Sequence, residues 1–178
     1  MLKANFITAQ EAAEKIQDGS TLCTIGMTLV SASESILKAI EKRFETVGHP
    51  ADITLVHSCG QSDRKDGIQH LAHEGLVKRI IGSHWGLQPR WMEMIANSQV
   101  EAYCLPQGQI AQFYRSMACG LPGKMSKVGL GTFIDPRVEG GKMNDRTKPL
   151  PDIVDILEYS GEEYMFYKEI PLDTVLIR

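Results

Sequence analysis

The residues with the clearest chemical use lie in one block of the sequence, from Leu105 to Asn144. Three glycine-bearing motifs follow one another there: residues 106–108 (Pro-Gln-Gly), 128–133 (Val-Gly-Leu-Gly-Thr-Phe) and 135–142 (Asp-Pro-Arg through Gly-Gly-Lys). Glycines crowded beside one carboxamide favour a site that binds an acyl or carboxylate group through neutral hydrogen-bond donors. We interpret this block as half of an active site.

Gln107 is the side chain of this block that could hold such a group. Its carboxamide can donate a hydrogen bond to a carboxylate or carbonyl oxygen without forming an ion pair, which leaves a carboxylate free to react. Gly108 would let a substrate approach the backbone closely. A second interpretation stays equally open, in which the two residues form the first turn of a helix and Gln107 is only an exposed side chain.

Gly26 and Met27 open a loop that follows an apolar strand and precedes a capped helix. Free backbone N–H groups in such a place can hold an anion. The loop, residues 26–33, contains one glycine, so neither a GxGxxG nor a P-loop pattern exists. The local sequence alone favours a structural turn over a specific anion site.

Two histidines, His70 and His73, lie three residues apart and could share one face of a helix. The order His-Leu-Ala-His-Glu is not the His-Glu-x-x-His of zinc proteases, and no obvious third ligand accompanies the pair. Capping and core hydrogen bonds are therefore favoured, and no metal is expected. Asp135 and Arg137 are expected to form a structural ion pair around the proline between them.

A nucleophile and a base also lie close together in residues 57–59, His-Ser-Cys. Neighbours on a strand face opposite sides of the sheet, so a hydrolase triad is not expected there. The four cysteines show no Cys-x-x-Cys spacing and have apolar or small neighbours, as reduced core thiols do. They favour a cytoplasmic location.

Composition limits the classes of partner. The 178 residues fit one domain with a real core, at 43% hydrophobic and 23% charged residues. Acidic residues outnumber basic ones by 22 to 19 without any block of like charge, which argues against nucleic acid or an anionic membrane as partner. No apolar run reaches the roughly 18 residues of a membrane span, and the N-terminus turns polar too early for a signal peptide.

Apolar runs and capping signals alternate along the first two thirds of the chain. The expected helices cover residues 9–17, 34–44, 69–77, 89–97 and 109–119, and the expected strands cover 21–25, 53–57, 79–82 and 100–104. This alternation predicts an α/β domain with a mainly parallel sheet.

The last third of the sequence breaks this pattern. Residues 120–152 have no periodicity and are expected to form a long loop, and residues 154–158 and 163–167 are expected to form a hairpin. The chain finishes on an apolar strand at residues 174–178. Sites in open α/β sheets form in loops at the carboxyl ends of strands, and no such loop follows this strand, so a fragment is expected.

Taken together, these residues resemble the class I coenzyme A-transferases, specifically the single-chain acetate/propionate type. The resemblance runs from about Ile7 to Arg178. The blocks that carry it are Gly60-Gln61, His70 to Gly82, His84-Trp85-Gly86, Pro106-Gln107-Gly108, and Val128 through Asn144. Each block alone is weak, whereas the combination is highly specific.

The resemblance implies an open, mainly parallel α/β sheet with helices on both faces. Residues 1–178 would then be an N-terminal domain, incomplete at its C-terminal end, and the catalytic C-terminal half would be absent. The reaction would be ping-pong transfer of CoA between short-chain acids, as in fatty acid and ketone body metabolism. Its glutamate nucleophile would lie in the absent half, so no glutamate of this chain is assigned that role.

The resemblance also implies partners and site residues. The partners would be an acyl-CoA, a short-chain carboxylate and a C-terminal, beta-like half or subunit, in a homo-oligomer when complete. CoA would be a substrate, and no cofactor would be needed. Gln107 matches a glutamine of the family's acyl pocket, with Gly108 beside it, and Gly26 with Met27 matches part of the glycine-rich first signature.

That first signature departs from the family pattern, which reads Gly-Gly-Phe, three residues, then Gly-x-Pro. The aligned residues here are Ile25-Gly26-Met27 and Ser31-Ala32-Ser33, so the loop is expected to follow a different path. Two alternatives to a transferase therefore remain: a non-catalytic remnant that serves as a binding or assembly module, and an acyl-CoA hydrolase.

Overall fold

The computed structural model describes residues 4–178. Its helices are α1 (Ala9–Glu14), α2 (Glu34–Val47), α3 (Pro89–Ala96) and α4 (Gln107–Ala118), with a 3₁₀ helix, η1 (Gly67–Leu71). Its strands are β1 (Thr21–Thr24), β2 (Ile53–His57), β3 (Val77–Gly82), β4 (Glu101–Cys104), β5 (Gly123–Ser126), β6 (Val154–Tyr159), β7 (Glu162–Lys168) and β8 (Thr174–Leu176). Strands and helices alternate up to α4, as expected.

The main sheet has five parallel strands in the order β4-β3-β2-β1-β8. Its two outer strands differ. The outer side of β4 is covered by residues 141–143, through a bridge between Tyr103 and Lys142 and a 2.7 Å hydrogen bond from the N–H of Cys104 to the carbonyl of Gly141. β8 pairs with β1 alone among the described residues.

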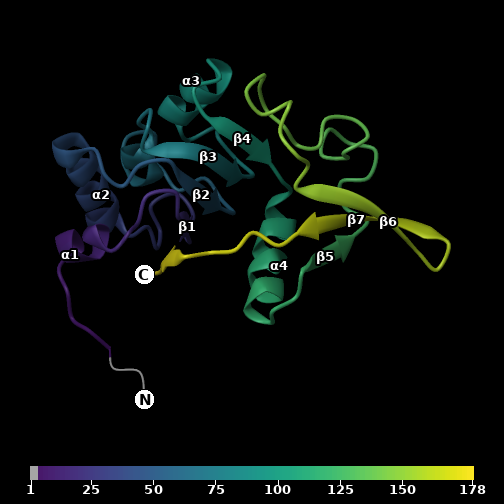
Figure 1. The fold of residues 1–178 in the computed structure, drawn as a ribbon, viewed down its shortest axis with the longest axis horizontal. Helices are drawn as coiled ribbons and strands as arrows, with labels where there is room; N and C mark the ends of the chain where they lie inside the picture. Colours follow the sequence, from purple (N-terminus) through teal and green to yellow (C-terminus); the bar gives the residue numbers. More distant parts are fainter. Residues whose placement is uncertain (1–3) are drawn as a thin grey trace.

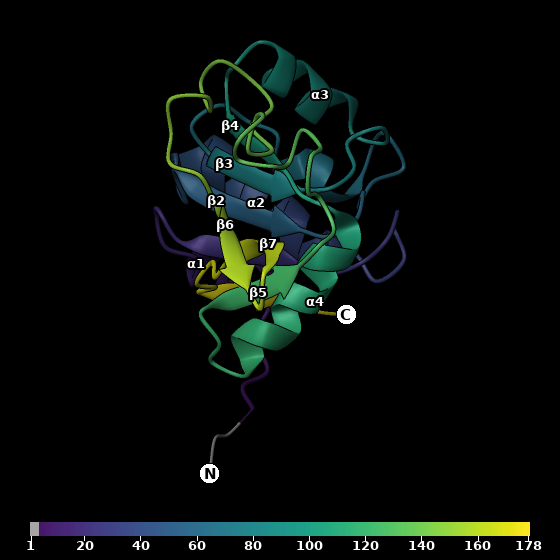
Figure 2. The same cartoon turned by 90° about the vertical axis from the view of Figure 1, so that its right-hand side faces the viewer.

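Each face of the main sheet carries its own core. Successive strand residues alternate between the two faces, so that Leu22 joins one apolar cluster and Cys23 the other. The first cluster packs against α1, α2, η1 and α3. The second packs against α4, the loop after β5 and the small sheet. Figures 1 and 2 show the two layers on opposite sides of the strands. Helices cover both faces, as expected.

The small sheet is antiparallel, in the order β5-β7-β6. The expected hairpin is confirmed: β6 and β7 turn at Ser160-Gly161, both with positive φ (54° and 76°), as two-residue hairpin turns require. β5 corrects the expectation of one unbroken loop over residues 120–152. It forms by pairing with β7, some forty residues further on, which local periodicity does not reveal.

Local signals indicated most helix positions correctly. Thr8 and Glu11 form the capping box of α1, and Pro89 begins α3. The expected helix over residues 69–77 is wrong, however. Left-handed glycines stand at both ends of this stretch, Gly67 (φ 77°) and Gly75 (φ 88°), and only one 3₁₀ turn forms between them before β3 begins at Val77.

The cysteine expectation needs a correction too. All four thiols are free, but only Cys23 is buried; Cys59 and Cys104 are half-buried and Cys119 is exposed. Cys119 is the C-cap of α4, and it is exposed despite its apolar neighbours in the sequence. Across residues 4–178, none of the helices has the length and apolar character needed to cross a bilayer.

Candidate functional site

The site residues predicted from the sequence lie at one edge of the main sheet, where its parallel strands end. Four segments meet there: the loops 25–33, 58–66 and 83–88 after β1, β2 and β3, and the start of α4 after β4. Ligand sites of open parallel sheets form at this edge. The fold therefore puts the predicted residues where such a site is expected.

Gln107 and Gly108 form the first turn of α4, with Pro106 as N-cap and no side-chain cap. Both residues are exposed, and a Cβ on Gly108 would meet no atom within 4 Å. The first N–H groups of a helix lack intrahelical partners, and the helix dipole places partial positive charge there. The backbone and the Gln107 carboxamide together offer neutral donors to an acyl or carboxylate oxygen.

Gly26 and Met27 begin the loop after β1. Gly26 has φ 152°, and a Cβ on it would lie 2.7 Å from the Val30 carbonyl oxygen, so the turn itself requires glycine. The N–H of Met27 donates to the Val30 carbonyl at 3.0 Å, and the Met27 side chain is 58% exposed. The loop is thus a tight turn with an apolar tip, consistent with the structural interpretation of this glycine.

The two pairs of residues share an edge but are not brought together. β2 and β3 separate β1 from β4, so their ends lie roughly 14 Å apart at about 4.8 Å per strand. A single small carboxylate cannot contact both. A ligand as long as an acyl-CoA could span them.

Ser31, which the family resemblance aligns with the third glycine of the first signature, has a left-handed backbone, with φ 63°. A non-glycine residue in this region costs about 1–2 kcal/mol. We expect Ser31→Gly to raise the free energy of unfolding by about 1 kcal/mol in urea denaturation. Ser35→Gly is the matched control, because this exposed serine lies in the first turns of α2 and its replacement should destabilise by about 0.5 kcal/mol. Equal shifts in both variants would contradict strain at Ser31.

The loops after β1, β2 and β3 are locked together around Gly60. The Gly60 carbonyl accepts from the Thr28 N–H at 2.8 Å, and a Cβ on Gly60 would lie 2.7 Å from Nδ1 of His84. The Gln61 carboxamide donates to the Thr24 carbonyl at 2.7 Å, and the Gln88 carboxamide accepts from the Gln61 N–H at 3.0 Å. Two blocks that carry the family resemblance, Gly60-Gln61 and His84-Trp85-Gly86, thus lie where these three loops contact one another.

His57 ends β2 and is fully buried. Its Nδ1 donates to the Cys59 carbonyl at 2.8 Å, and Trp85 packs edge-on against the ring at 5.0 Å between centroids. Burial lowers the pKa of His57 to about 4, although the hydrogen bond to Cys59 opposes this shift. Nε2 lies against Gly82, where a Cβ would be 2.5 Å away. The main chain at Gly82 thus encloses Nε2, and burial makes the ring a weak base.

Sequence reasoning missed a set of buried polar groups at this edge. Four such atoms lack a hydrogen-bond partner among the described residues: Thr24 Oγ1, His57 Nε2, Gln61 Oε1 and Gln109 Oε1. Two more, Trp85 Nε1 and the Tyr114 hydroxyl, lie beside the thiols of Cys104 and Cys23 and have only these weak partners or the Ser58 side chain. All belong to the ends of β1 or β2 or to the segments that follow β2, β3 and β4. Buried polar groups are rarely unpaired. Because these atoms gather at this edge, it is the region of the described residues where buried polar atoms most lack hydrogen-bond partners.

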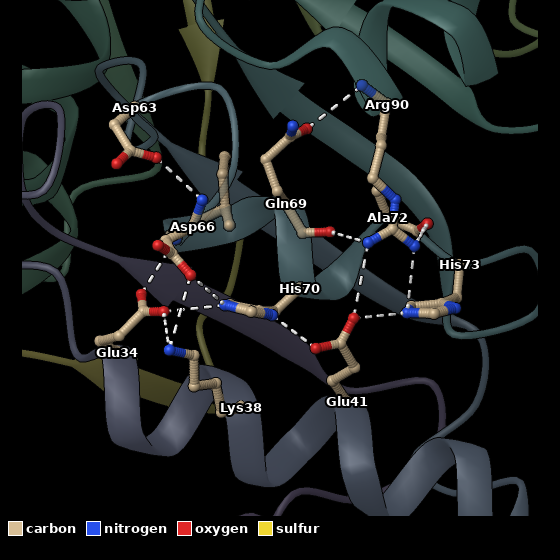
Figure 3. Close-up of polar contacts among 12 residues, drawn as sticks. Glu34, Lys38, Glu41, Asp63, Asp66, Gln69, His70, Ala72, His73 and Arg90 are labelled. Atoms are coloured by element: carbon tan, nitrogen blue, oxygen red, sulfur yellow. Dashed lines mark hydrogen bonds and ion pairs between the residues drawn. The ribbon is translucent and has the colours of Figure 1, made fainter.

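The histidines of the His70–Gly82 block bind α2. His70 lies between two carboxylates, with Nε2 2.8 Å from Glu34 and Nδ1 2.5 Å from Glu41, and Nε2 of His73 is 2.9 Å from Glu41 (Figure 3). Burial alone would raise the pKa of Glu41, but hydrogen bonds from His73 and His70 outweigh it and lower the pKa. Lys38 adds an ion pair with Glu34, at 3.1 Å. These contacts fasten the segment after β2 to α2.

The glycine-rich block after β5 is organised by Asp135, which is 1% exposed. Its carboxylate accepts from the N–H of Gly131 at 2.9 Å and from two guanidinium nitrogens of Arg137 at 3.0 and 2.8 Å. The Arg137 hydrogen bonds, the largest cause, lower the pKa of Asp135 strongly. Arg137 also binds Glu163 of β7. The expected ion pair is confirmed, and its role is to hold the loop to the small sheet.

Fold and sequence now define the class. Residues 6–178 match the family described as Coenzyme A transferase, so the chain belongs to the coenzyme A transferase family. The whole described fold, including the carboxyl edge with Gln107, lies inside this match.

Particular relatives narrow the class. The chain is 42% identical to caffeate CoA-transferase of Acetobacterium woodii over 98% of this chain and 33% of that protein. It resembles the crystal structure of the acyl-CoA transferase YdiF of Escherichia coli O157:H7, a thioester complex with CoA, with a TM-score of 0.92 at 36% identity over 97% of this chain and 34% of that one.

A more distant relative is a separate subunit. The acetate CoA-transferase subunit alpha of Escherichia coli K12 is 24% identical over 99% of this chain and 70% of that subunit. The chain thus spans about a third of the length of the first two relatives, and more than two thirds of this subunit.

Proposed function

We propose that this chain is the N-terminal segment of a short-chain acyl-CoA:carboxylate CoA-transferase that works by a ping-pong mechanism. The observation that carries the proposal is the unpaired donor set at the start of α4, Gln107 with the first free N–H groups, at the carboxyl edge of the sheet. The family membership supports it, and so do the names of two relatives, a caffeate CoA-transferase and an acetate CoA-transferase.

The proposed chemistry is nucleophilic catalysis by a glutamate outside this chain. Its carboxylate attacks the thioester carbonyl of the acyl-CoA and expels CoA as the thiolate, forming an acyl-glutamyl anhydride. The thiolate then attacks the glutamyl carbonyl and releases the first acid, leaving a glutamyl-CoA thioester. A second carboxylate repeats these steps in reverse and leaves as the new acyl-CoA.

The proposed task of Gln107 and Gly108 is to hold the acyl oxygen. Negative charge develops on this oxygen when the carboxylate attacks, and neutral donors aimed at it stabilise that state. A carboxamide is suited to this task because it does not form an ion pair with the attacking carboxylate. Gly26 and Met27 would contact another part of the acyl-CoA, since they lie about three strand spacings away.

The complete enzyme is proposed to pair this segment with a catalytic half, fused or separate, in a homo-oligomer. CoA is a substrate, and the proposed chemistry needs no cofactor or metal. The four free cysteines favour a cytoplasmic location.

Exchange of label between acetyl-CoA and acetate tests the proposal. We expect exchange by the complete enzyme without any second substrate, because ping-pong half-reactions run independently, and none by the 178-residue chain alone. Intact-mass spectrometry of the native product establishes whether the cell makes the longer enzyme. Exchange by the isolated chain would overturn the assignment of the nucleophile to another half.

The same assay separates the rival functions. Release of free CoA without a carboxylate acceptor would indicate an acyl-CoA hydrolase. A native product of 19.8 kDa without exchange, alone or with a partner, would indicate a remnant that serves in binding or assembly. The altered first signature, with Ser31 in a left-handed backbone, is the observation that favours the remnant.

A further inference from the structure

One of the five histidines of this chain, His84, differs from the other four in its surroundings. The others each bind a carboxylate or a carbonyl oxygen through a ring nitrogen; they are His49, His57, His70 and His73. His84 is exposed, and among residues 4–178 no hydrogen bond reaches its ring. In its neutral form this imidazole therefore keeps one N–H donor and one acceptor nitrogen for another partner.

Two glycines make room for the His84 ring. A Cβ on Gly60 would lie 2.7 Å from Nδ1 of His84, and a Cβ on Gly86 would lie 3.3 Å from its Nε2. Neither glycine has a left-handed backbone, so the main-chain conformation at these two positions does not itself require glycine. What both glycines provide is space for the ring, which is thus positioned by packing and not by hydrogen bonds.

His84 lies next to the start of α4. It follows the end of β3 by two residues, and the N–H of Leu105 donates to the Gly82 carbonyl at 2.9 Å, so the ends of β3 and β4 are adjacent. Gln107 follows Leu105 by two residues. The segments that carry His84 and Gln107 are therefore about one strand spacing, roughly 4.8 Å, apart.

His84 is also linked to the loop after β1. Gly60, which packs on the His84 ring, accepts a hydrogen bond from the N–H of Thr28 at 2.8 Å. Thr28 directly follows Gly26 and Met27. The ring thus lies between the two pairs of predicted site residues, which are themselves too far apart for one small ligand.

An acyl-CoA that extends from Gln107 toward Gly26 would pass His84. The nearer amide of its pantetheine arm begins four covalent bonds from the acyl carbon, about 5 Å along an extended chain. This reach matches the one strand spacing between Gln107 and His84. An amide offers an N–H donor and a carbonyl acceptor, and the free nitrogens of the imidazole can pair with either.

We infer that the His84 ring hydrogen-bonds the pantetheine amide nearer to the thioester and is thus a substrate-binding residue. The inference rests on the proposed function and adds a contact to the same site. This amide takes no part in the reaction, so its contact with His84 is equally strong before and during the chemical step. The contact already exists in the glutamyl-CoA intermediate, and its loss should therefore affect capture of the acyl-CoA but not attack by the second carboxylate.

Steady-state kinetics of the complete transferase, with acetyl-CoA and acetate or another carboxylate varied, test the contact. His84→Ala should lower kcat/KM for acetyl-CoA about tenfold, the effect of one lost hydrogen bond, and leave kcat/KM for the carboxylate unchanged. His84→Gln keeps a donor and an acceptor and should stay within about threefold of the unaltered enzyme. His49→Ala is the control, because this exposed histidine precedes β2 at the opposite end of the strands; it should change neither value.

Gly60→Ala tests the position of the ring. Its Cβ would displace Nδ1 of His84, so kcat/KM for acetyl-CoA should fall as in His84→Ala. The double variant should be no worse than His84→Ala alone, because the two changes remove the same contact. Urea unfolding checks that every variant keeps the fold.

The outcomes separate this inference from the proposed function. If the unaltered enzyme exchanges label between acetyl-CoA and acetate but His84→Ala keeps full kcat/KM for acetyl-CoA, the inference fails and the proposed function stands. Equal losses for both substrates would also overturn the inference, as would additive losses in the double variant. Failure of His84→Gln to restore activity would overturn it because a charge, and not a hydrogen bond, would then be required. No exchange by the unaltered enzyme would overturn the proposed function and this inference together.

Discussion

Gln107→Ala in the complete transferase is expected to lower kcat/KM by about 10- to 100-fold, which corresponds to about 1–3 kcal/mol of lost transition-state stabilisation. The side chain is exposed at the first turn of α4 and supports no other group, so folding should be unaffected. If its hydrogen bond strengthens as charge develops on the acyl oxygen, kcat falls while KM changes little. Steady-state kinetics with varied acyl-CoA and carboxylate measure both.

Gln112→Ala is the matched control, because this glutamine is exposed on the same helix, five residues further from the carboxyl edge. It should keep the rate of the unaltered enzyme. Full activity in both variants would show that the start of α4 takes no part in holding the substrate.

Gly67→Ala is expected to lower the free energy of unfolding by about 3 kcal/mol, from the combined cost of a left-handed backbone and of overpacking. Gly67 has φ 77°, and a Cβ on it would lie 2.0 Å from the Gln61 carbonyl oxygen. The added Cβ is bonded directly to the main chain and the Gln61 oxygen is part of it, so neither atom can move away by rotation of a side chain. The N–H of Gly67 also donates to Glu34 at 2.9 Å, which ties this turn to α2. Urea unfolding of the chain measures the change.

Gly19→Ala separates the two contributions to this loss. Gly19 has a similar φ of 70°, but a Cβ there would meet no atom within 4 Å. It should lose only about 1 kcal/mol, the cost of the left-handed backbone. Losses of equal size in the two variants would mean that the turn at Gly67 relaxes and that the close approach to Gln61 is not a constraint.

Elements with strong local signals were predictable from sequence. The capping box at Thr8, the proline at Pro89 and the apolar runs at residues 21–25 and 53–57 each depend on neighbours within a few positions. β5 could not be predicted in this way, because its partner β7 is distant along the chain. The order of the strands, with β8 beside β1, is likewise a long-range property.

The candidate site was likewise predictable only in part from the sequence. A strand, a loop and a helix start in sequence were enough to place Gly26 and Gln107 at strand ends, so their common edge was predictable. The separation of these residues by two strands was not, because it depends on sheet order. The unpaired atoms of Thr24 and Gln61 could not be found either, since burial of a polar atom arises only when the loops close over it.

The two edges of the main sheet have a consequence for solubility. Fibril growth by strand addition requires an open sheet edge on both sides of every molecule, because each copy must bind two others. Here the outer side of β4 is covered by the Tyr103–Lys142 bridge. Gly141 also packs closely on the Cys104 carbonyl, since a Cβ on Gly141 would lie 2.6 Å from its oxygen. The β4 side of the main sheet is therefore closed to strand addition between molecules. Deletion of residues 141–143 would expose this edge.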